Sequence, residues 1–232
     1  MARERKGSSS TLADEVYAQI KADVIEGRLR PGERLTLTPL CQRFGVSLSV
    51  VREALTRLAE QKLARATPQQ GFMVTPVSAQ HLTELTDARL EIEIIVLRRA
   101  LAQGDLSWEA RVLASHHLLA NTPTGDPDPV SPAWTGAHRD FHAAVASGCN
   151  NTLLLQIRQD LYDSAELYRN WSAHASLRSR DILTEHRLIA EAVVARDQEH
   201  AVRLMHEHLT MTAKLVLDRA AEDEPVPTRD TA

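Results

Sequence analysis

The segment FGVSLSVVREALTRL, residues 44–58, constrains the fold of this chain more than any other stretch. Gly45 can supply a tight turn after a short helix that ends at Phe44, and Ser47 or Ser49 can cap the helix that follows. The second helix carries an apolar stripe formed by Val50, Val51, Ala54, Leu55 and Leu58. Two helices joined by a tight glycine turn predict a helix-turn-helix.

The flanking segments predict a winged version of this unit. Residues 11–26 place apolar side chains at steps of four, which is typical of an amphipathic helix. Residues 63–76 contain two short runs around a polar Pro-Gln-Gln-Gly tip, which indicates a β-hairpin. We therefore expect a winged helix-turn-helix over residues 11–76, preceded by a flexible N-terminus over residues 1–10.

From Pro76 onward the sequence changes to long helical patterns, so we expect a domain boundary there. Six helices are predicted, over residues 78–103, 107–120, 131–147, 151–173, 179–196 and 198–218. Their short connections predict an all-α antiparallel bundle over residues 78–218. The acidic, Pro-containing residues 219–232 are expected to form a disordered tail. The predicted fold class is therefore mostly α.

The composition excludes several classes of protein. Aromatic residues make up only 4% of the chain, which favours helices over sheets. Cys41 and Cys149 lie far apart and form neither a disulfide framework nor a cysteine-based zinc pattern. No stretch approaches ~20 uninterrupted apolar residues, so neither secretion nor a membrane span is predicted. A cytoplasmic protein fits these features.

Charge is divided unevenly along the chain. Residues 1–76 hold 12 Lys and Arg against 8 Asp and Glu, and the remainder holds 15 against 23. Such an asymmetry suggests that the N-terminal part meets a polyanion. In a helix-turn-helix the second helix offers its N-terminal residues to the major groove of double-stranded DNA. The candidates for that role are Ser47, Leu48, Ser49, Arg52 and Thr56.

Arg52 is the sharpest of these candidates. Its guanidinium can contact phosphate or pair bidentately with guanine. The alternative is an ion pair with a nearby carboxylate on a solvated face, and for a lone helix that interpretation would be preferred. The basic N-terminal part, the tight turn and the predicted wing together favour DNA.

The stretches EVYAQIKADVIEGRLRPGERL and FGVSLSVVREALTRLAEQKLARATPQQGFMV resemble the GntR superfamily of bacterial transcription regulators. The shared pattern includes I-x-x-G-x-L-x-P-G-x-x-L and G-V-S-x-x-x-V-R-E-A-L, and it covers residues 12–76. The resemblance implies that Ser47, Ser49 and Arg52 touch operator DNA and that Gly71 lies in a wing entering the minor groove.

Two positions depart from the pattern of that superfamily. Thr38 and Leu48 stand where its members often have Arg, and both positions usually contribute to groove or phosphate contacts. Each base contact is worth ~1 to 3 kcal/mol of discrimination. We therefore expect an operator sequence other than the usual one, with Leu48 placed to meet a thymine methyl.

Four histidines share the buried phase of three predicted helices. They are His138, His142, His186 and His208. Any one of them alone is more simply explained as a core histidine satisfied by hydrogen bonds. An i, i+4 pair with single histidines from other helices is also a recognised way to hold a divalent metal in a bundle. For the four together, a metal site is favoured.

The stretches AHRDFHAAVASGCNNTLL, EHRLIAEAVVARD and AVRLMHEHL resemble the FCD effector domain of the FadR-like GntR subgroup, over residues 80–217. The ligands of its metal-binding members are one Asp and three His, and the four histidines occupy the matching positions. His138 stands where Asp is usual, and Asp140 lies about 200° around the helix from His142. Four neutral imidazoles leave the metal charge uncompensated, which predicts zinc or nickel rather than magnesium or calcium.

Arg89 matches the R-x-x-[LI]-E segment of the same domain. The resemblance implies that it reaches a carboxylate ligand near the metal, whereas the alternative is an Arg on a solvated helix face. Together these features predict a ligand-responsive repressor, a homodimer on a palindromic operator that senses a small carboxylate, and not an enzyme. The alternatives are a metal-dependent enzyme, with Glu185 as the one obvious general base although its helical phase points elsewhere, and a metal-free acyl-CoA sensor.

Overall fold

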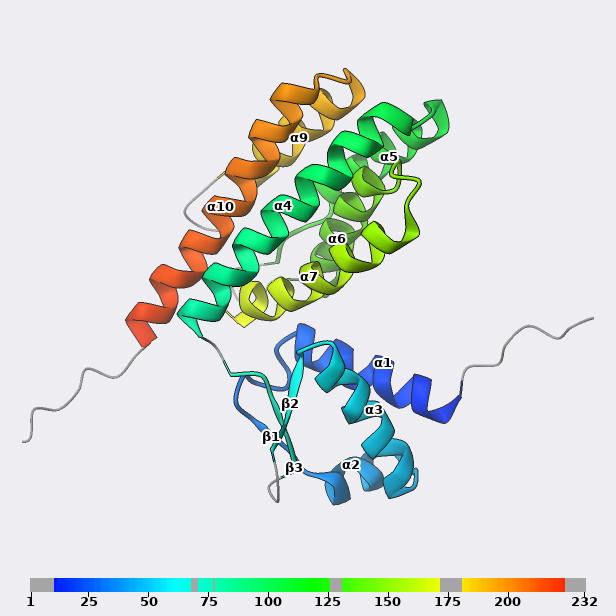
Figure 1. Cartoon of the computed structure of the whole chain (residues 1–232), viewed down its shortest axis with the longest axis vertical. Coiled ribbons are helices and arrows are strands. Elements are labelled where there is room, and N and C mark those ends of the chain that lie inside the picture. Colours follow the sequence, from blue (N-terminus) through cyan, green and yellow to red (C-terminus); the bar gives the residue numbers. More distant parts are fainter. Residues whose placement is uncertain (1–10, 68–70, 77, 126–130, 172–180, 224–232) are drawn as a thin grey trace, which may run out of the picture. The chain divides into compact units, whose positions relative to one another are not determined.

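The computed structural model describes residues 11–67, 71–76, 78–125, 131–171 and 181–223 (Figure 1). The chain divides into two compact units, Met1–Pro76 and Val77–Ala232. Three predicted features lie outside the described residues. They are the flexible N-terminus over residues 1–10, the hairpin tip at residues 68–70, and residues 224–232 of the tail.

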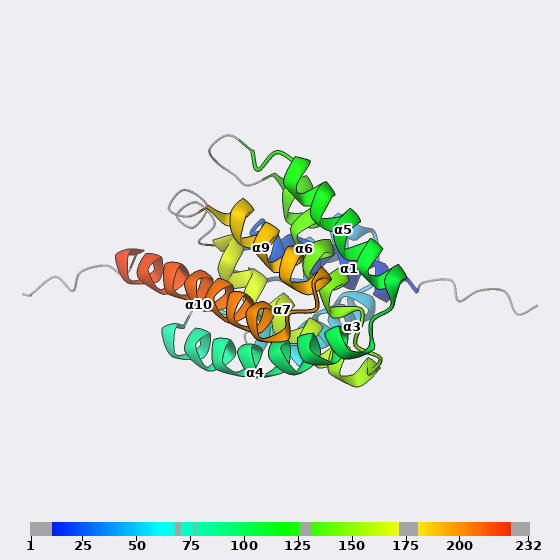
Figure 2. The ribbon, with the colours of Figure 1, turned by 90° about the horizontal axis from the view of Figure 1, so that it is seen from above.

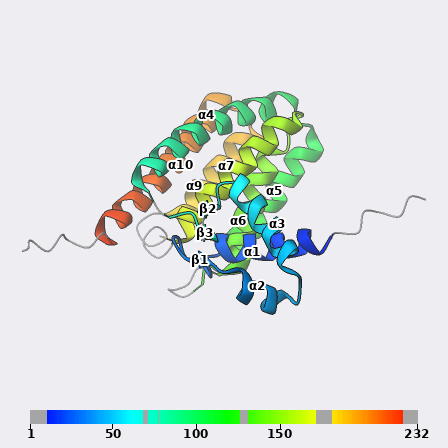
Figure 3. The same ribbon diagram turned by 60° about the horizontal axis from the view of Figure 1, so that its bottom comes forward.

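The N-terminal unit consists of short helices and strands. In chain order they are α1 (Leu12–Ile25), β1 (Arg34–Leu35), α2 (Leu37–Phe44), α3 (Leu48–Glu60), β2 (Ala64–Thr67) and β3 (Gly71–Val74). Figure 3 shows the strands to one side of the three helices. A capping box between Thr11 and Asp14 starts α1, because each side chain accepts a hydrogen bond from the backbone of the other.

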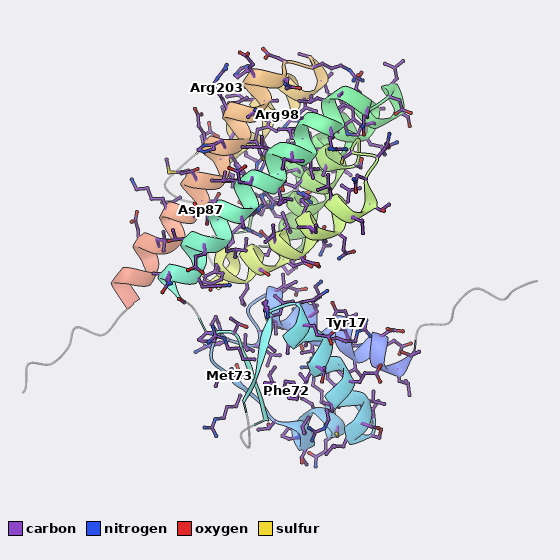
Figure 4. All side chains as sticks on the ribbon, viewed as in Figure 1. Tyr17, Phe72, Met73, Asp87, Arg98 and Arg203 are labelled. Atoms are coloured by element: carbon purple, nitrogen blue, oxygen red, sulfur yellow. The ribbon has the colours of Figure 1, made fainter. Side chains whose placement is uncertain are left out.

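The predicted helix-turn-helix is formed by α2 and α3. Gly45 ends α2 with a φ of 65°, a left-handed conformation that glycine adopts without steric penalty. The predicted apolar stripe of α3 faces the interior, where Val51, Ala54, Leu55 and Leu58 are fully buried. Tyr17 of α1 packs against the same helix and donates a hydrogen bond to Gln61 at 2.5 Å (Figure 4).

The sheet has three antiparallel strands in the order β1-β3-β2, one more than the predicted hairpin. β1 pairs Arg34 with Met73, and β2 pairs Ala64 with Val74. Phe72 is buried, whereas Met73, its neighbour in β3, is half-buried (Figure 4). Gly71 opens β3 with a φ of 86°, which explains why glycine follows the wing tip.

The C-terminal unit contains the six predicted helices. They are α4 (Ala79–Gln103), α5 (Leu106–Asn121), α6 (Pro132–Ala146), α7 (Thr152–Trp171), α9 (Ile182–Val194) and α10 (Gln198–Asp223). The long helices α4 and α10 lie side by side, and α7 packs against α4 (Figures 1 and 2). The predicted start of the tail is wrong, because α10 continues through residues 219–223.

The bundle core holds α6 in a fixed position against α5. Trp108 of α5 is buried and donates hydrogen bonds from its ring nitrogen to the carbonyl oxygens of Ala144 and Val145, at 3.0 and 3.2 Å. Phe141 and Trp134 of α6 are also fully buried. α6 therefore projects its remaining inward side chains at defined points, and these include two histidines. Within the described part of the chain, no helix has the length and apolar character that crossing a membrane requires.

Candidate functional site

The N-terminal end of α3 presents polar side chains to solvent. Ser47, Leu48, Ser49 and Arg52 are all exposed, as is Thr38 on α2. Ser47 occupies the N-cap position without capping the helix, and its Oγ lies instead 2.9 Å from Oγ of Ser49. Thr56 donates its hydroxyl proton to the carbonyl oxygen of Arg52 at 2.8 Å. The exposed face at the start of α3 thus consists of two hydroxyls, a leucine and a guanidinium.

Arg52 differs from the other arginines of this helix pair. Arg43 lies 2.6 Å from a carboxylate oxygen of Asp23, and Arg57 lies 2.7 Å from one of Asp14. Within the described residues, Arg52 forms no such ion pair, and its side chain is open to solvent. The alternative interpretation of Arg52, an ion pair with a nearby carboxylate, therefore has no support among the described residues.

The four predicted histidines meet inside the bundle. His138 and His142 come from α6, His186 from α9 and His208 from α10. Their exposed fractions are 0–4%, and their ring centroids lie 4.6 to 6.3 Å apart. One nitrogen from each ring can be chosen such that all four lie within 4.8 Å of one another. Three helices thus bring to one point four imidazoles that span residues 138–208 of the sequence.

The rings are held by neighbours on two further sides. Trp134 stacks on His138 with centroids 5.0 Å apart, and the guanidinium of Arg169 lies 5.8 Å from the Trp134 ring. The hydroxyl of Tyr162, from α7, lies 3.2 Å from Nδ1 of His138. Nε2 of His142 lies 3.3 Å from Nε2 of His186. The cluster is therefore packed by aromatic rings rather than open to water.

Burial keeps the imidazoles of α6 in their neutral form. Burial lowers the pKa of His138 well below its usual value, and the neighbouring His142 and Arg169 lower it further. Burial also lowers the pKa of His142, and His208 and His186 act in the same direction. The neutral imidazole is the form that binds metal ions.

The geometry of the cluster fits a transition-metal ion. Zinc-bound imidazole nitrogens lie ~2.0–2.1 Å from the ion, so two of them in a tetrahedral site are about 3.3 Å apart. Nε2 of His142 and Nε2 of His186 are separated by 3.3 Å. The largest separation, 4.8 Å, exceeds that edge, so binding of an ion must draw the outer rings inward. An all-nitrogen set suits zinc or nickel rather than magnesium or calcium.

Asp140 of α6 and Glu185 of α9 differ in their position relative to the histidine cluster. Asp140 is exposed on α6, away from the cluster, as its helical phase predicts. Glu185 was expected to point elsewhere, and this expectation is wrong. Its Oε2 lies 2.8 Å from Nδ1 of His208. The Glu185 side chain reaches across from α9 to α10, a contact that the phase of α9 alone does not reveal.

Arg89 is buried rather than solvated, which excludes the second interpretation offered for it. Burial lowers the pKa of its guanidinium, which lies 5.0 Å from the centre of the Tyr162 ring. Its Nε has no hydrogen-bond partner within the described part of the chain. Arg89 also lines a cavity of about 20 Å³ between α4, α7 and α10, together with Arg169 and Thr212. That volume holds about one water molecule.

A buried ion pair joins α4 and α7 beside the cluster. Arg158 binds Glu93 through three hydrogen bonds of 2.8 to 3.0 Å, and its NH2 group also donates to the carbonyl oxygen of His142 at 3.2 Å. Burial acts to lower the pKa of Arg158, but the Glu93 carboxylate holds it above its usual value. A second pair, Arg169 with Glu166, is held at 2.5 and 2.6 Å. Sequence patterns gave no signal for Glu93–Arg158, whereas Glu166 and Arg169 are three residues apart on one helix, a spacing that allows such a pair.

Comparison with known proteins assigns both units. The family described as bacterial regulatory proteins, gntR family, matches residues 12–74, and the FCD domain family matches residues 84–211. The chain belongs to the GntR family of bacterial regulatory proteins. The gntR match contains the exposed end of α3, and the FCD match contains Arg89 and all four clustered histidines. The resemblance recognised in the sequence is confirmed.

Relatives within the GntR family are similar over most of their length. The chain is 34% identical to the uncharacterized HTH-type transcriptional regulator BphR of Paraburkholderia xenovorans, covering 89% of this chain and 85% of the relative. It is also 34% identical to the HTH-type transcriptional repressor GlaR of Escherichia coli, covering 83% and 90%. These relatives are transcriptional regulators and not enzymes, which agrees with the predicted class.

Solved structures show the same fold. A putative GntR transcriptional regulator from Rhodococcus sp. RHA1 aligns with a TM-score of 0.74 at 26% identity, covering 90% of this chain and 99% of that one. E. coli McbR/YncC aligns with a TM-score of 0.75 at 22% identity, covering 91% and 100%. A winged helix-turn-helix followed by a helical domain is thus the fold of this chain, as predicted.

Proposed function

We propose that this protein is a ligand-responsive repressor. In the proposed mechanism, a homodimer binds a palindromic DNA operator through its winged helix-turn-helix domains. The FCD domain holds a zinc ion, or alternatively nickel, through His138, His142, His186 and His208, and it binds a small carboxylate next to that ion. The observation that carries this proposal is the convergence of four buried imidazole nitrogens within 4.8 Å. The proposed site of action is the cytoplasm, where bacterial DNA lies.

The DNA-binding half of the proposal rests on the exposed end of α3. Arg52 is exposed and unpaired within the described residues, so its donors are available for guanine or phosphate. Ser47 and Ser49 offer hydroxyls, and Leu48 offers an apolar surface suited to a thymine methyl. One winged domain provides too little contact for tight specific binding. Two domains related by a two-fold axis read two half-sites, hence the proposed homodimer and palindrome.

Two further residues complete the proposed DNA interface. Thr38 is exposed on α2, the helix in front of the recognition helix, and is assigned to phosphate or groove contacts. Gly71 is exposed at the start of β3 and is assigned to the wing that would enter the minor groove. Thr38 has a short side chain and Gly71 has none, so they would contribute close approach of the backbone rather than long-range charge. The salt dependence of binding must then come mainly from arginine and lysine side chains.

The metal-binding part of the proposal depends on nitrogen donors that are already close together. The neutral forms of His138 and His142 are favoured by burial, so no proton has to be removed before a metal binds at neutral pH. When bound, the zinc ion would supply a Lewis acid, and it would attract a carboxylate oxygen as a fifth ligand beside the four histidine nitrogens. The four histidines position it, and Trp134 and Phe141 exclude bulk water from the same space.

The effector-binding part of the proposal places the carboxylate beside Arg89. This guanidinium is buried, lines the cavity between α4, α7 and α10, and has an unused Nε donor within the described residues. A cavity of about 20 Å³ is too small for a carboxylic acid, so a ligand must separate these helices before it fits. A ligand that binds only the widened arrangement shifts the population towards it.

The wall of that cavity is connected to the start of α4. The hydroxyl of Tyr168 lies 2.6 Å from Nδ1 of His81, which sits in the first turn of α4. Displacing Tyr168 would therefore move the helix end that follows the boundary between the two units. This contact is the proposed route by which effector binding reaches the DNA-binding domain, and coupling measurements must test it.

The two alternative functions have less support. A hydrolytic enzyme needs a general base near a metal-bound water, but Glu185 is engaged with His208 rather than with an open position. The cavity must widen for any organic ligand, but an acyl-CoA with its long chain would require a much larger separation of the helices than a small carboxylate. Arg89 and Arg169 beside the cavity favour a compact anion instead.

The experiment separates DNA binding from effector binding with single substitutions. Fluorescence anisotropy on labelled DNA from upstream of the chain's own gene gives operator affinity, and thermal melting with a panel of small carboxylic acids identifies effectors. Arg52→Ala should lose operator affinity but keep the melting shift, because α3 carries DNA binding only. Arg89→Ala should keep operator affinity and lose the shift.

Arg98→Ala is the matched control, since Arg98 is exposed on the same helix as Arg89 (Figure 4). It removes the same charge and should leave both measurements unchanged. Absence of any specific DNA fragment for the wild-type protein would contradict the regulator. A carboxylate that raises the melting temperature of wild type and Arg89→Ala equally would contradict the assignment of Arg89.

A further inference from the structure

We infer that Glu185 is a positioning residue of the metal site, which orients His208 and supplies the negative charge that the four ligands lack. This inference rests on the proposed metal-binding function. Oε2 of Glu185 lies 2.8 Å from Nδ1 of His208, across the interface between α9 and α10. The His208 side chain is buried, whereas that of Glu185 keeps 29% of its surface exposed.

The contact selects one tautomer of His208. A carboxylate accepts a hydrogen bond, so the proton of the neutral ring belongs on Nδ1. Nε2 is then unprotonated and lies on the opposite edge of the ring, which is the edge available to the cluster. A ligand histidine whose second nitrogen donates to a carboxylate is the recurring arrangement of structural and catalytic metal sites.

His138 has a comparable arrangement without the charge. The hydroxyl of Tyr162 lies 3.2 Å from Nδ1 of His138, and its oxygen can accept the Nδ1 proton. Burial raises the pKa of Tyr162, so this hydroxyl stays neutral. Nδ1 of His142, by contrast, has no hydrogen-bond partner within the described residues. Of the hydrogen bonds that the described residues make to Nδ1 of His138 and His208, the bond from Glu185 is distinguished by the charge of its carboxylate.

Two buried carboxylates near the cluster are bound by arginines. Glu93 is bound by Arg158 through three hydrogen bonds, and Glu166 is bound by Arg169 through two. Asp140 is exposed and faces away from the cluster. Among the described residues, Glu185 places a carboxylate oxygen within hydrogen-bond distance of a cluster ring, so it would couple a negative charge directly to a dication held by the four neutral rings.

The test uses Glu185→Gln, which keeps the shape of the side chain and removes its charge. Zinc affinity is measured by competition with a chromophoric chelator, and cobalt is titrated in parallel to follow its visible absorption band. Loss of an outer-shell partner typically weakens metal binding by about 10- to 100-fold, and this is the loss expected here. The cobalt band of the variant should also shift at saturation, because the donor strength of His208 changes. Glu191→Gln is the matched control on the same helix, since Glu191 pairs with Arg187 in solvent.

The outcomes distinguish this inference from the function on which it rests. Wild-type protein that takes up neither zinc nor cobalt contradicts the metal site itself. Wild-type protein that binds zinc, with Glu185→Gln binding it within two-fold and showing an unchanged cobalt band, overturns the role of Glu185. Circular dichroism and melting of the metal-free variants confirm folding. If Glu185→Gln is unfolded, Glu185→Asp replaces it. Zinc affinity below that of the wild type in Glu185→Asp, whose carboxylate is shorter, supports the inference. Wild-type zinc affinity with an unchanged cobalt band overturns it.

Discussion

The buried pair Glu93–Arg158 offers a quantitative test of how the site is supported. Both side chains are 4% exposed, and Arg158 makes three hydrogen bonds to Glu93 and a fourth to the carbonyl oxygen of His142. Glu93→Leu removes the carboxylate and leaves a buried guanidinium without its counter-charge. Because Arg158 also holds the backbone of a proposed metal ligand, the damage should extend to the histidine cluster.

The magnitude follows from the burial of the pair. Removing one partner of a buried ion pair destabilises a protein by about 3–5 kcal/mol, because the remaining charge is uncompensated. For a domain of this size, 1 kcal/mol corresponds to about 2–4 °C in melting temperature. Glu93→Leu should therefore lower the melting temperature of the C-terminal unit by about 6–20 °C. Glu93→Leu combined with Arg158→Met should recover much of this loss, since replacing both charges with apolar groups is often close to neutral.

Differential scanning calorimetry on metal-free protein measures the effect, and an exposed pair provides the control. Arg187 and Glu191 are 50% and 59% exposed, so Glu191→Gln should change the free energy of unfolding by less than about 1 kcal/mol. Equal effects of Glu93→Leu and Glu191→Gln would refute the reasoning. A double variant less stable than Glu93→Leu alone would also refute it.

Three further predictions concern DNA, pH and metal. Arg52→Ala should weaken operator binding by about 1–3 kcal/mol in fluorescence anisotropy, and unchanged affinity would remove Arg52 from the interface. Burial lowers the pKa of His138 and His142 in the folded protein, so these histidines take up protons in the unfolded chain first as the pH falls. The free energy of unfolding should therefore decrease as the pH falls below about 6.5, towards the lower pKa of the folded state. Melting of metal-free protein at pH 7.5 and 5.5 checks this, and a fall undiminished in His142→Gln would contradict it. Free zinc at 100 times its Kd stabilises the folded protein by about 2.7 kcal/mol. EDTA should therefore lower the melting temperature of zinc-loaded wild type but not that of His208→Ala. Equal responses of the two proteins would contradict the ligand role of His208.

Helical periodicity predicted the features that depend on one helix at a time. In the predicted stripe of α3, Val50 is half-buried and the other four side chains, Val51, Ala54, Leu55 and Leu58, are buried. The four histidines His138, His142, His186 and His208 are buried as their phases indicated. In each case the side chain points directly at the core, so its position on the helical wheel is sufficient. The convergence of the four rings also required the resemblance to the FCD domain, because phase alone does not place three helices around one point.

Contacts between helices were not predictable in this way. Glu185 precedes His186 and is rotated about 100° from it, yet its flexible side chain reaches His208 on α10. Glu93 and Arg158 are 65 residues apart and meet only because α4 packs against α7. Charged residues on a helix are usually solvated, so sequence reasoning favours an exposed position for them.

Short or terminal elements were also missed. β1 contains only Arg34 and Leu35, too few residues for an alternating pattern to be recognised. α10 extends to Asp223 through a segment whose composition resembles that of a tail. Helix ends are set by local capping and packing, and these are the least certain part of any reading based on periodicity.

Anomalous diffraction from crystals of zinc-loaded protein tests the central claim most directly. Data on both sides of the zinc absorption edge should give a peak about 2.0–2.1 Å from one nitrogen each of His138, His142, His186 and His208. A zinc peak elsewhere on the chain, or no peak among these four rings in protein exposed to excess zinc, would contradict the account.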